Sequence, residues 1–135
     1  MAVLQWSEDF SVNVKEIDDQ HKVLISMINE LHEALLAKKG REVQKPIIDK
    51  MIAYAKDHFA LEENCMRKFN YADYEAHQRS HAVFTQKTDE LQERLEKVGF
   101  VFTVEIINFL RDWLRDHILG VDKKYSRLFN ENGLS

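Results

Sequence analysis

The residues best suited to chemistry in this chain form two pairs, His58 with Glu62 and His77 with His81, each at i, i+4 spacing. On an α-helix, residues four apart project from one face about one turn apart, so each pair could ligate one metal or two neighbouring metals. A chain reversal at 70–71 would place the two pairs at the same level, facing each other. One such pair is common on surface helices. Two pairs in register indicate a shared site.

A second regularity concerns distance from the expected loops. If the chain reverses near Gly40 and Gly99, five histidines and one glutamate lie 18 to 22 residues from a reversal, which is about 27 to 33 Å along a helix. They are His21, His58, Glu62, His77, His81 and His117. Asp122 joins them if the backbone loosens around Gly120, because i, i+5 on a regular helix points about 140° away from the face of His117.

These side chains predict a metal centre. Buried imidazoles and carboxylates are costly unless they are paired or bound to metal. Seven ligands exceed one tetrahedral or octahedral protein site, whereas two ions that share bridging carboxylates would use all of them. Nitrogen and oxygen donors without thiolate suit iron, manganese or zinc, and the spacing alone does not choose among these metals.

Composition narrows the class of protein. A chain of 135 residues with 44% hydrophobic and 31% charged residues, four Gly and one Pro is typical of one globular helical domain. The net charge of −4, with both signs intermixed, argues against a nucleic-acid partner or an anionic membrane surface. The lone Cys65 fits a reducing compartment. No signal-like start or run of 18 apolar residues is present, so we expect no membrane insertion and a cytoplasmic location.

Apolar periodicity predicts four long helices, at about 18–39, from within 41–46 to about 69, 74–97 and 103–118, with a short helix at about 123–129. Residues 1–17 are apolar without helical periodicity and predict an extended arm packed on the domain. We expect Asp18 or Asp19 to cap the first helix and Gly40 to end it. Pro46 should lie in the first turn of the second helix. Asp73 should cap the third helix, Val98 and Gly99 should end it, and Thr103 should cap the fourth. We therefore expect one all-α domain over 1–135, an antiparallel up-down-up-down four-helix bundle with an extended N-terminal arm and a short C-terminal helix.

Four runs of sequence resemble the bacterial hemerythrins of the hemerythrin-like domain family. The resemblance covers nearly the whole chain, and its combined HxxxE, HxxxH and HxxxxD pattern is highly specific. None of the seven expected ligand positions is substituted. The runs are Ile17 to His21, His58 to Glu63, His77 to His81 and Trp113 to Tyr125, with Trp6 in the arm.

This resemblance implies a non-haem di-iron centre with a bridging hydroxide or oxide. It assigns His77, His81 and His117 to one iron, His21 and His58 to the other, and Glu62 and Asp122 as bridges. In the family, dioxygen binds at an open position of the second iron. Family correspondence places apolar residues around that position as a dry dioxygen pocket, namely Leu24, Phe59, Trp113, Leu114 and Ile118.

The implied function is reversible dioxygen binding for storage, delivery or sensing, with an oxygen-consuming or signalling protein as a possible partner. The alternatives are a di-iron enzyme, such as a peroxidase or a nitric-oxide-handling protein, and iron storage. No general acid or base beyond the ligands is evident, so we expect no enzyme. Dioxygen and nitric oxide both stay open as the biological ligand.

Four further positions have simpler interpretations. His32 lies eleven residues from His21 without a matching partner and is expected at the surface. Glu63 is expected to be a solvated neighbour of Glu62. Asp18 or Asp19, besides capping, could contact His21. Cys65 is expected to be a small buried hydrophobe.

Overall fold

The computed structural model describes residues 4–98 and 103–135, and every regular element among them is a helix. The all-α prediction is confirmed. The elements are the 3-10 helix η1 (Glu8–Phe10), α1 (Lys15–Leu36), α2 (Gly40–Lys68), α3 (Tyr74–Val98), α4 (Thr103–Gly120), the 3-10 helix η2 (Asp122–Tyr125) and α5 (Ser126–Glu131).

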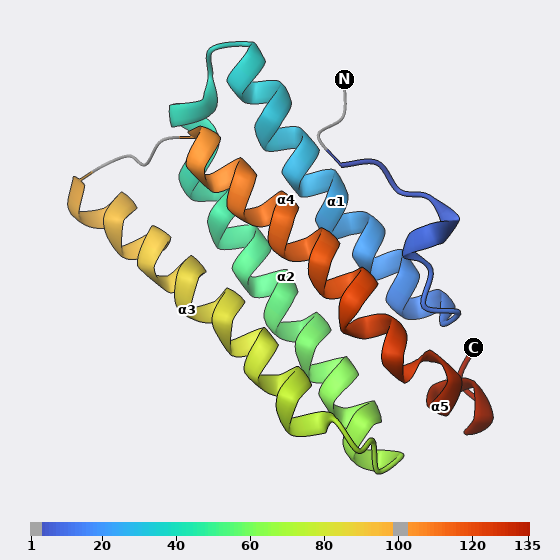
Figure 1. Ribbon diagram of the computed structural model, residues 1–135. Helices are drawn as coiled ribbons and strands as arrows, with labels where there is room; N and C mark the ends of the chain where they lie inside the picture. The colour runs from blue at the N-terminus through green and yellow to red at the C-terminus, as the bar shows by residue number, and fades with distance from the viewer. Residues whose placement is uncertain (1–3, 99–102) are drawn as a thin grey trace.

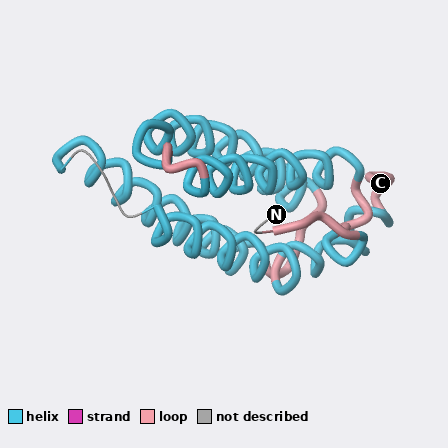
Figure 2. The backbone as a smooth tube through the Cα atoms, turned by 90° about the horizontal axis from the view of Figure 1, so that it is seen from above, coloured by secondary structure: helices cyan, strands magenta, loops and turns pink. Residues whose placement is uncertain are grey.

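The four long helices form an antiparallel bundle in which each consecutive helix reverses direction (Figure 1). Helix α1 packs between α2 and α4, and α3 packs against α2 and α4. The view turned by 90° shows the long helices running along the bundle, with the C-terminal segment at one end (Figure 2). The predicted up-down-up-down topology is therefore confirmed. The chain reversal after α2, the end of α4 and α5 all lie at the same end of the bundle (Figure 1).

Helix α1 stops one turn earlier than the predicted stop at Gly40. Lys38 adopts φ 62°, and the N–H groups of Lys38 and Lys39 donate to the carbonyls of Leu35 and Ala34 at 3.0 and 2.7 Å. This is a Schellman motif with lysine in the left-handed position that glycine usually takes. The prediction was wrong because it assigned the stop to the nearest glycine, and Gly40 instead begins α2.

The chain reversal between the two ligand pairs is as predicted and uses the same motif. Asn70 adopts φ 58°, and the N–H of Tyr71 donates to the carbonyl of Met66 at 2.8 Å. Asparagine tolerates this conformation better than most residues. The turn therefore reverses the chain between His58 and His77.

The predicted start of α1 was wrong. The helix begins at Lys15 after Val14, which makes no side-chain cap, so Asp18 and Asp19 lie inside it. The carboxylate of Asp18 accepts hydrogen bonds from the Ser11 hydroxyl at 2.6 Å and the Val12 N–H at 2.9 Å. Asp18 therefore fastens the arm to α1 instead of capping the helix.

Pro46 lies inside α2, seven residues along it, and not in the first turn as predicted. Its ring nitrogen cannot donate to a preceding carbonyl, so α2 forms despite one missing hydrogen bond. The expected stop at Gly99 lies outside the described residues, as does the Thr103 side chain, while α3 ends at Val98 as predicted. Helix α4 continues two residues beyond the predicted Ile118, to Gly120.

Residues 4–14 of the arm pack along the bundle, and residues 15–17 belong to α1. The main chain of Leu4 exchanges two hydrogen bonds with the Asn29 side chain, at 3.2 and 2.8 Å. Ser126 Oγ donates to the Val12 carbonyl, and Lys123 Nζ donates to the Asp9 carbonyl at 2.7 Å. The arm is thus held by both α1 and the C-terminal helices, at the end of the bundle where the candidate ligands were expected.

One apolar core runs through the bundle and includes Val12 and Val14 of the arm together with Leu31, Leu91 and Leu110 of the helices, all almost fully buried. This buried apolar surface is the main stabilising contribution to the fold. Within the described part of the chain, no helix is both long enough and apolar enough to cross a membrane.

Candidate metal centre

The seven predicted ligands come from every long helix and from the turn after α4. Helix α1 contributes His21, α2 contributes His58 and Glu62, α3 contributes His77 and His81, α4 contributes His117, and η2 begins with Asp122. The predicted loosening near Gly120 is present, because α4 ends there and Val121 adopts φ −120° before the 3-10 turn. This break turns Asp122 back toward the bundle axis.

All seven side chains are buried. The described residues contain nine buried polar or charged side chains, and seven of these are the predicted ligands. The other two, Gln44 and Thr88, carry no charge. Because ionisable groups are rarely buried without a partner, their concentration at one level of an otherwise apolar bundle indicates a functional site.

The two carboxylates lie at the centre of the cluster. Asp122 Oδ1 lies 2.8 Å from both His77 Nε2 and His117 Nε2, and its Oδ2 lies 3.1 Å from His21 Nε2. Glu62 Oε1 lies 2.7 Å from His58 Nε2 and 3.7 Å from His81 Nε2. All five histidines therefore turn Nε2 inward, toward one of two acidic groups.

These donor atoms divide into two groups that could each hold an ion, with candidate ligand atoms no more than 4.8 Å apart within each group. The groups share Glu62 and Asp122. The first adds His77, His81 and His117, and the second adds His21 and His58. A pair of neighbouring metal sites joined by two carboxylates is the arrangement that uses every donor.

Hydrogen bonding within the described residues leaves the inward-facing atoms unsatisfied. Despite the short separations, these atoms are buried without a partner of hydrogen-bond geometry: Nε2 of His21, His77, His81 and His117, Oε1 of Glu62, and both oxygens of Asp122. A buried, unsatisfied polar group costs about 1–3 kcal/mol. Metal coordination would satisfy all of them at once, so the donor set fits a pair of ions with mixed nitrogen and oxygen ligands.

Electrostatics favour the ligating forms of His81 and Asp122. Burial lowers the pKa of His81 to about 3, so its imidazole is neutral at physiological pH. Burial raises the pKa of Asp122, but His117 and other histidines outweigh that effect and hold it well below its ordinary value. Burial lowers the pKa of His58, but the charge and hydrogen bond of Glu62 raise it by more, so the pKa lies above its ordinary value. A metal at His58 therefore competes with a proton that this imidazole binds more readily than an exposed one does.

Three of the five histidines are oriented through Nδ1 by residues that the sequence interpretation did not assign to them. His58 Nδ1 lies 2.6 Å from Gln20 Oε1, and His117 Nδ1 lies 2.7 Å from Ser80 Oγ. His81 Nδ1 lies 3.0 Å from Glu63 Oε2. The expectation that Glu63 is only a solvated neighbour of Glu62 was wrong, because its side chain is 17% exposed and contacts a ligand.

These three partners follow a rule that could have been read from the sequence. Each is the immediate sequence neighbour of a ligand, and each contacts the histidine of the next helix along the chain. Neighbouring residues on a helix differ by about 100° in direction. If one of them points to the bundle axis, the other points toward an adjacent helix.

Tyr125 is a further member of the site that sequence analysis placed only in a family run. Its hydroxyl donates to Glu62 Oε2 at 2.6 Å, and its ring stacks on His77 with centroids 5.6 Å apart. Burial and the charges of Glu62 and Asp122 raise the pKa of Tyr125 well above its ordinary value, so the phenol is protonated and acts as a donor. Its position one 3-10 turn after Asp122 is the sequence signal.

An enclosed apolar cavity adjoins the ligand cluster. The volume open to the centre of a water-sized molecule is about 10 Å³. This is about the minimum that a cavity needs to hold one such molecule. Four of the five predicted pocket residues line it, namely Leu24, Phe59, Trp113 and Leu114. The rest of the lining is Ile28, Met51, Ala55, Phe84 and Leu110. Ile118 is fully buried but does not line this cavity, so that part of the expectation differs from the structure.

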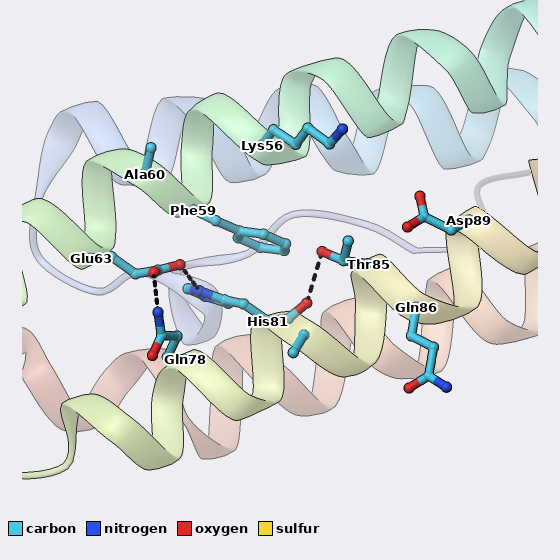
Figure 3. A pocket seen from close by; sticks show the side chains of 10 residues that line it. Lys56, Phe59, Ala60, Glu63, Gln78, His81, Thr85, Gln86 and Asp89 are labelled. Atoms are coloured by element: carbon cyan, nitrogen blue, oxygen red, sulfur yellow. Dashed lines mark hydrogen bonds and ion pairs between the residues drawn. The ribbon is translucent and has the colours of Figure 1, made fainter.

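An open groove of about 670 Å³ lies on the other side of His81, between α2 and α3 (Figure 3). Phe59 and His81 contribute to its floor, with Glu63 and Gln78 at one end and Asp89 at the other. The cluster is therefore flanked by a small apolar cavity and by an open groove.

The remaining expectations concern residues near the site. His32 belongs to neither donor group, as expected, but it is half-buried beside Leu35 and Ile107 and not a surface residue. Asp19 pairs with Lys15 at 2.7 Å, and Asp18 accepts hydrogen bonds from the arm. Both carboxylates therefore have partners other than His21. Cys65 is half-buried and packs against the core, so it is less buried than expected.

Comparison with known proteins gives one consistent result. Residues 12–129 match the family described as Hemerythrin HHE cation binding domain. The bacteriohemerythrin of Methylococcus capsulatus (strain ATCC 33009 / NCIMB 11132 / Bath) is 36% identical over 126 residues, which are 93% of this chain and 95% of that protein. The myohemerythrin of Theromyzon tessulatum is 30% identical over 121 residues, which are 90% of this chain and 89% of that protein.

Solved structures agree with these sequence relationships. A crystal structure of wild-type hemerythrin superposes with a TM-score of 0.87 and 34% sequence identity, covering 94% of this chain and 98% of that chain. The crystal structure of an L114A hemerythrin variant superposes with a TM-score of 0.88 at the same 34% identity, covering 95% of this chain and 98% of that one.

Proposed function

The chain belongs to the hemerythrin family and thus binds oxygen at a di-iron centre, and we propose that the seven buried residues described above are the ligands of that centre. In this proposal His77, His81 and His117 hold one iron, His21 and His58 hold the other, and Glu62 and Asp122 bridge them. A bridging hydroxide or oxide completes the set. The observation that carries the proposal is that the two donor groups share two carboxylates.

The division of ligands explains where a small molecule would bind. In this assignment three histidines and the two shared carboxylates would hold one iron, while two histidines and the same carboxylates would hold the other. The second iron would have fewer protein ligands and so could accept a small molecule. We propose the second iron as the dioxygen site and the cavity bordered by Leu24, Phe59, Trp113 and Leu114 as its dry surroundings.

The chain's own residues account for reversible binding. Apolar walls exclude water and anions that would promote irreversible oxidation. Neutral imidazoles supply most of the ligands, which leaves the centre with less negative charge than a carboxylate-rich site and disfavours highly oxidised iron. Tyr125 supports the bridge by donating to Glu62 Oε2 at 2.6 Å. When bound, the iron pair would supply the redox chemistry of reversible dioxygen binding.

We propose binding and not catalysis as the role, in storage, delivery or sensing. The cavity is bordered by apolar and aromatic side chains and offers no separate general acid or base to a substrate. We further propose that residues 1–135 act as one hemerythrin-like domain. A cytoplasmic location is supported by the unpaired Cys65, and the acidic net charge of −4 favours neither nucleic acid nor an anionic membrane as partner.

The test is anaerobic reconstitution with ferrous iron, followed by alternating air and argon while visible absorption is recorded. We expect two irons per chain and an oxygenated spectrum that returns to the deoxy spectrum under argon over several cycles. A spectrum that does not recover, together with turnover of peroxide or nitric oxide, would favour the enzyme alternative. Iron uptake well above two per chain would favour storage.

A further inference from the structure

Glu63 and His81 form a carboxylate–imidazole pair at one end of the open groove (Figure 3). Glu63 Oε2 lies 3.0 Å from His81 Nδ1. The other carboxylate oxygen, Oε1, accepts a hydrogen bond from Gln78 Nε2 at 3.3 Å. Glu63 is thus held between a ligand histidine and a second residue of α3, and its carboxylate is directed at the imidazole.

This pair differs in charge from the other recorded Nδ1 contacts of the cluster. Gln20, beside His58, and Ser80, beside His117, are neutral. Within the described residues, Glu63 is the only carboxylate among these Nδ1 partners. The outward contacts of the five histidines are therefore not equivalent, and His81 is the one with an anionic partner.

The charge has a consequence when His81 Nε2 binds a metal, because Nδ1 then keeps its hydrogen and becomes a donor. A carboxylate acceptor attracts that hydrogen more strongly than a neutral acceptor does, which increases the electron density that the ring offers to the metal. A more basic ligand stabilises the higher oxidation state of iron relative to the lower one. The effect would be confined to the iron that His81 holds.

Packing separates this charge effect from simple orientation. Phe59 stacks on the His81 ring with centroids 3.9 Å apart and planes 10° apart, and His81 is only 3% exposed. The ring plane is thus held by Phe59 even without Glu63. Replacing the carboxylate by an amide of nearly the same shape should therefore change the charge at Nδ1 more than the position of Nε2.

We propose that Glu63 is a positioning residue that acts through His81 to favour the ferric over the ferrous state of the iron held by His77, His81 and His117. This inference rests on the proposed function, because it requires His81 to be an iron ligand. Through this contact, the charge of Glu63 would influence whether the iron centre binds oxygen reversibly or is oxidised irreversibly.

Two substitutions isolate the charge. Glu63→Gln removes the charge but keeps an acceptor beside His81 Nδ1, whereas Glu63→Asp keeps the charge on a shorter side chain. Asp89→Asn is the matched control, because Asp89 lines the same groove and no contact with a ligand histidine is recorded for it. Gln78→Ala is an additional variant that leaves Glu63 in place and removes its second hydrogen bond.

The measurements are iron content, the midpoint potential of the iron centre by anaerobic spectroelectrochemistry, and the proton resonance of His81 Nδ1–H in the zinc-loaded protein. We expect two irons in all variants. Glu63→Gln should weaken the preference for ferric iron about tenfold, which raises the potential by about 59 mV for a one-electron couple. Its Nδ1–H resonance should move upfield, because the hydrogen bond weakens. Gln78→Ala removes a donor that withdraws electron density from Glu63, so it should shift both readouts in the opposite direction by less. Glu63→Asp should lie closer to the wild type.

The outcomes separate this inference from the proposed function. If the wild type holds two irons and oxygenates reversibly, but Glu63→Gln and Asp89→Asn have the same potential and the same His81 resonance, the role of Glu63 is overturned and the proposed function stands. If Glu63→Gln folds poorly, an unchanged potential in Gln78→Ala overturns it equally. If the wild type holds no iron, the proposed function fails, and this inference fails with it.

Discussion

Phe59 stacks on His81 with ring centroids 3.9 Å apart, and its side chain borders both the open groove and the enclosed cavity. Among the described residues it is the one side chain shared by these two spaces. The ring of Phe59 therefore forms part of the wall between the groove and the apolar cavity. This relationship makes Phe59 a wall of the proposed dioxygen site as well as a support for His81, a proposed ligand.

Phe59→Leu tests the wall. The shorter side chain should join the groove to the cavity and admit water, so we expect oxidation of the oxygenated protein to become several-fold faster while two irons stay bound. The free energy of unfolding should fall by about 1–3 kcal/mol. Phe84→Leu is the control, because Phe84 lines the cavity but not the groove. Equal oxidation rates in the two variants would show that Phe59 does not keep water out.

Tyr125→Phe tests the support of the bridging carboxylate. The substitution leaves Glu62 Oε2 without the hydrogen bond that Tyr125 donates at 2.6 Å in a fully buried position. We expect the metal-free protein to lose about 1–3 kcal/mol of stability and the iron affinity to fall, with ring stacking on His77 retained. Tyr54→Phe, at a half-buried position of the same bundle, should change neither. Denaturant unfolding and iron competition with a chelator measure the two effects, and parallel results for both variants would exclude a special role for Tyr125.

Iron stoichiometry tests the ligand assignment. His77→Ala or Glu62→Ala should lower the iron content below two per chain, because each removes a donor of the buried cluster. His32→Ala should leave it at two, since His32 belongs to neither donor group. Metal analysis of anaerobically reconstituted proteins decides the matter. Equal losses in His32→Ala and His77→Ala would contradict the assignment.

The cluster of seven buried residues could be predicted from the sequence because it depends only on positions along the helices. Spacing of i, i+4 fixes which helix face His58 and Glu62 share, and distance from a loop fixes the level at which His21 and His117 meet them. Both quantities follow from the constant rise and turn of a helix. Even Asp122, which a regular helix would turn away, was predictable once Gly120 was taken as the point where the helix loosens.

Features that depend on how helices rotate against each other were not predicted. The contact of Glu63 with His81 joins α2 to α3. The position of Glu63 next to the ligand Glu62 was a signal, but which residue it contacts depends on how the two helices pack. The same holds for Ile118, which is fully buried but does not line the cavity that Leu114 lines. The end of α1 at Leu36 was missed for a different reason, because Lys38 adopts after it a conformation that is usually assigned to glycine.

Removing the metal should destabilise one end of the bundle. Ions that bind only the native state stabilise it by mass action, and the buried donors lose their partners when the ions leave. We expect faster hydrogen exchange after chelation at residues 18–25, 58–62, 74–82 and 113–122. Exchange should change less at residues 30–36, 47–55 and 88–95, which lie toward the other end. The apolar core should keep the protein folded, and uniform acceleration along the helices would contradict a site confined to one end.

Leu114→Ala tests the dryness of the cavity without removing a ligand. Leu114 is 4% exposed, lines the cavity and lies three residues before His117, on nearly the same face of α4. Truncation enlarges the cavity and should cost about 2–5 kcal/mol in stability. The added space admits water or a small anion beside the open iron position, so the oxygenated protein should oxidise faster while its iron content stays at two. Leu36→Ala is the matched control, because Leu36 is 63% exposed at the far end of α1. Autoxidation rates and iron content are compared for the wild type and both variants in one buffer. A rate for Leu114→Ala that equals the rate for Leu36→Ala would remove Leu114 from the dioxygen pocket, and a fall in its iron content would mean that it supports the ligands instead of excluding water.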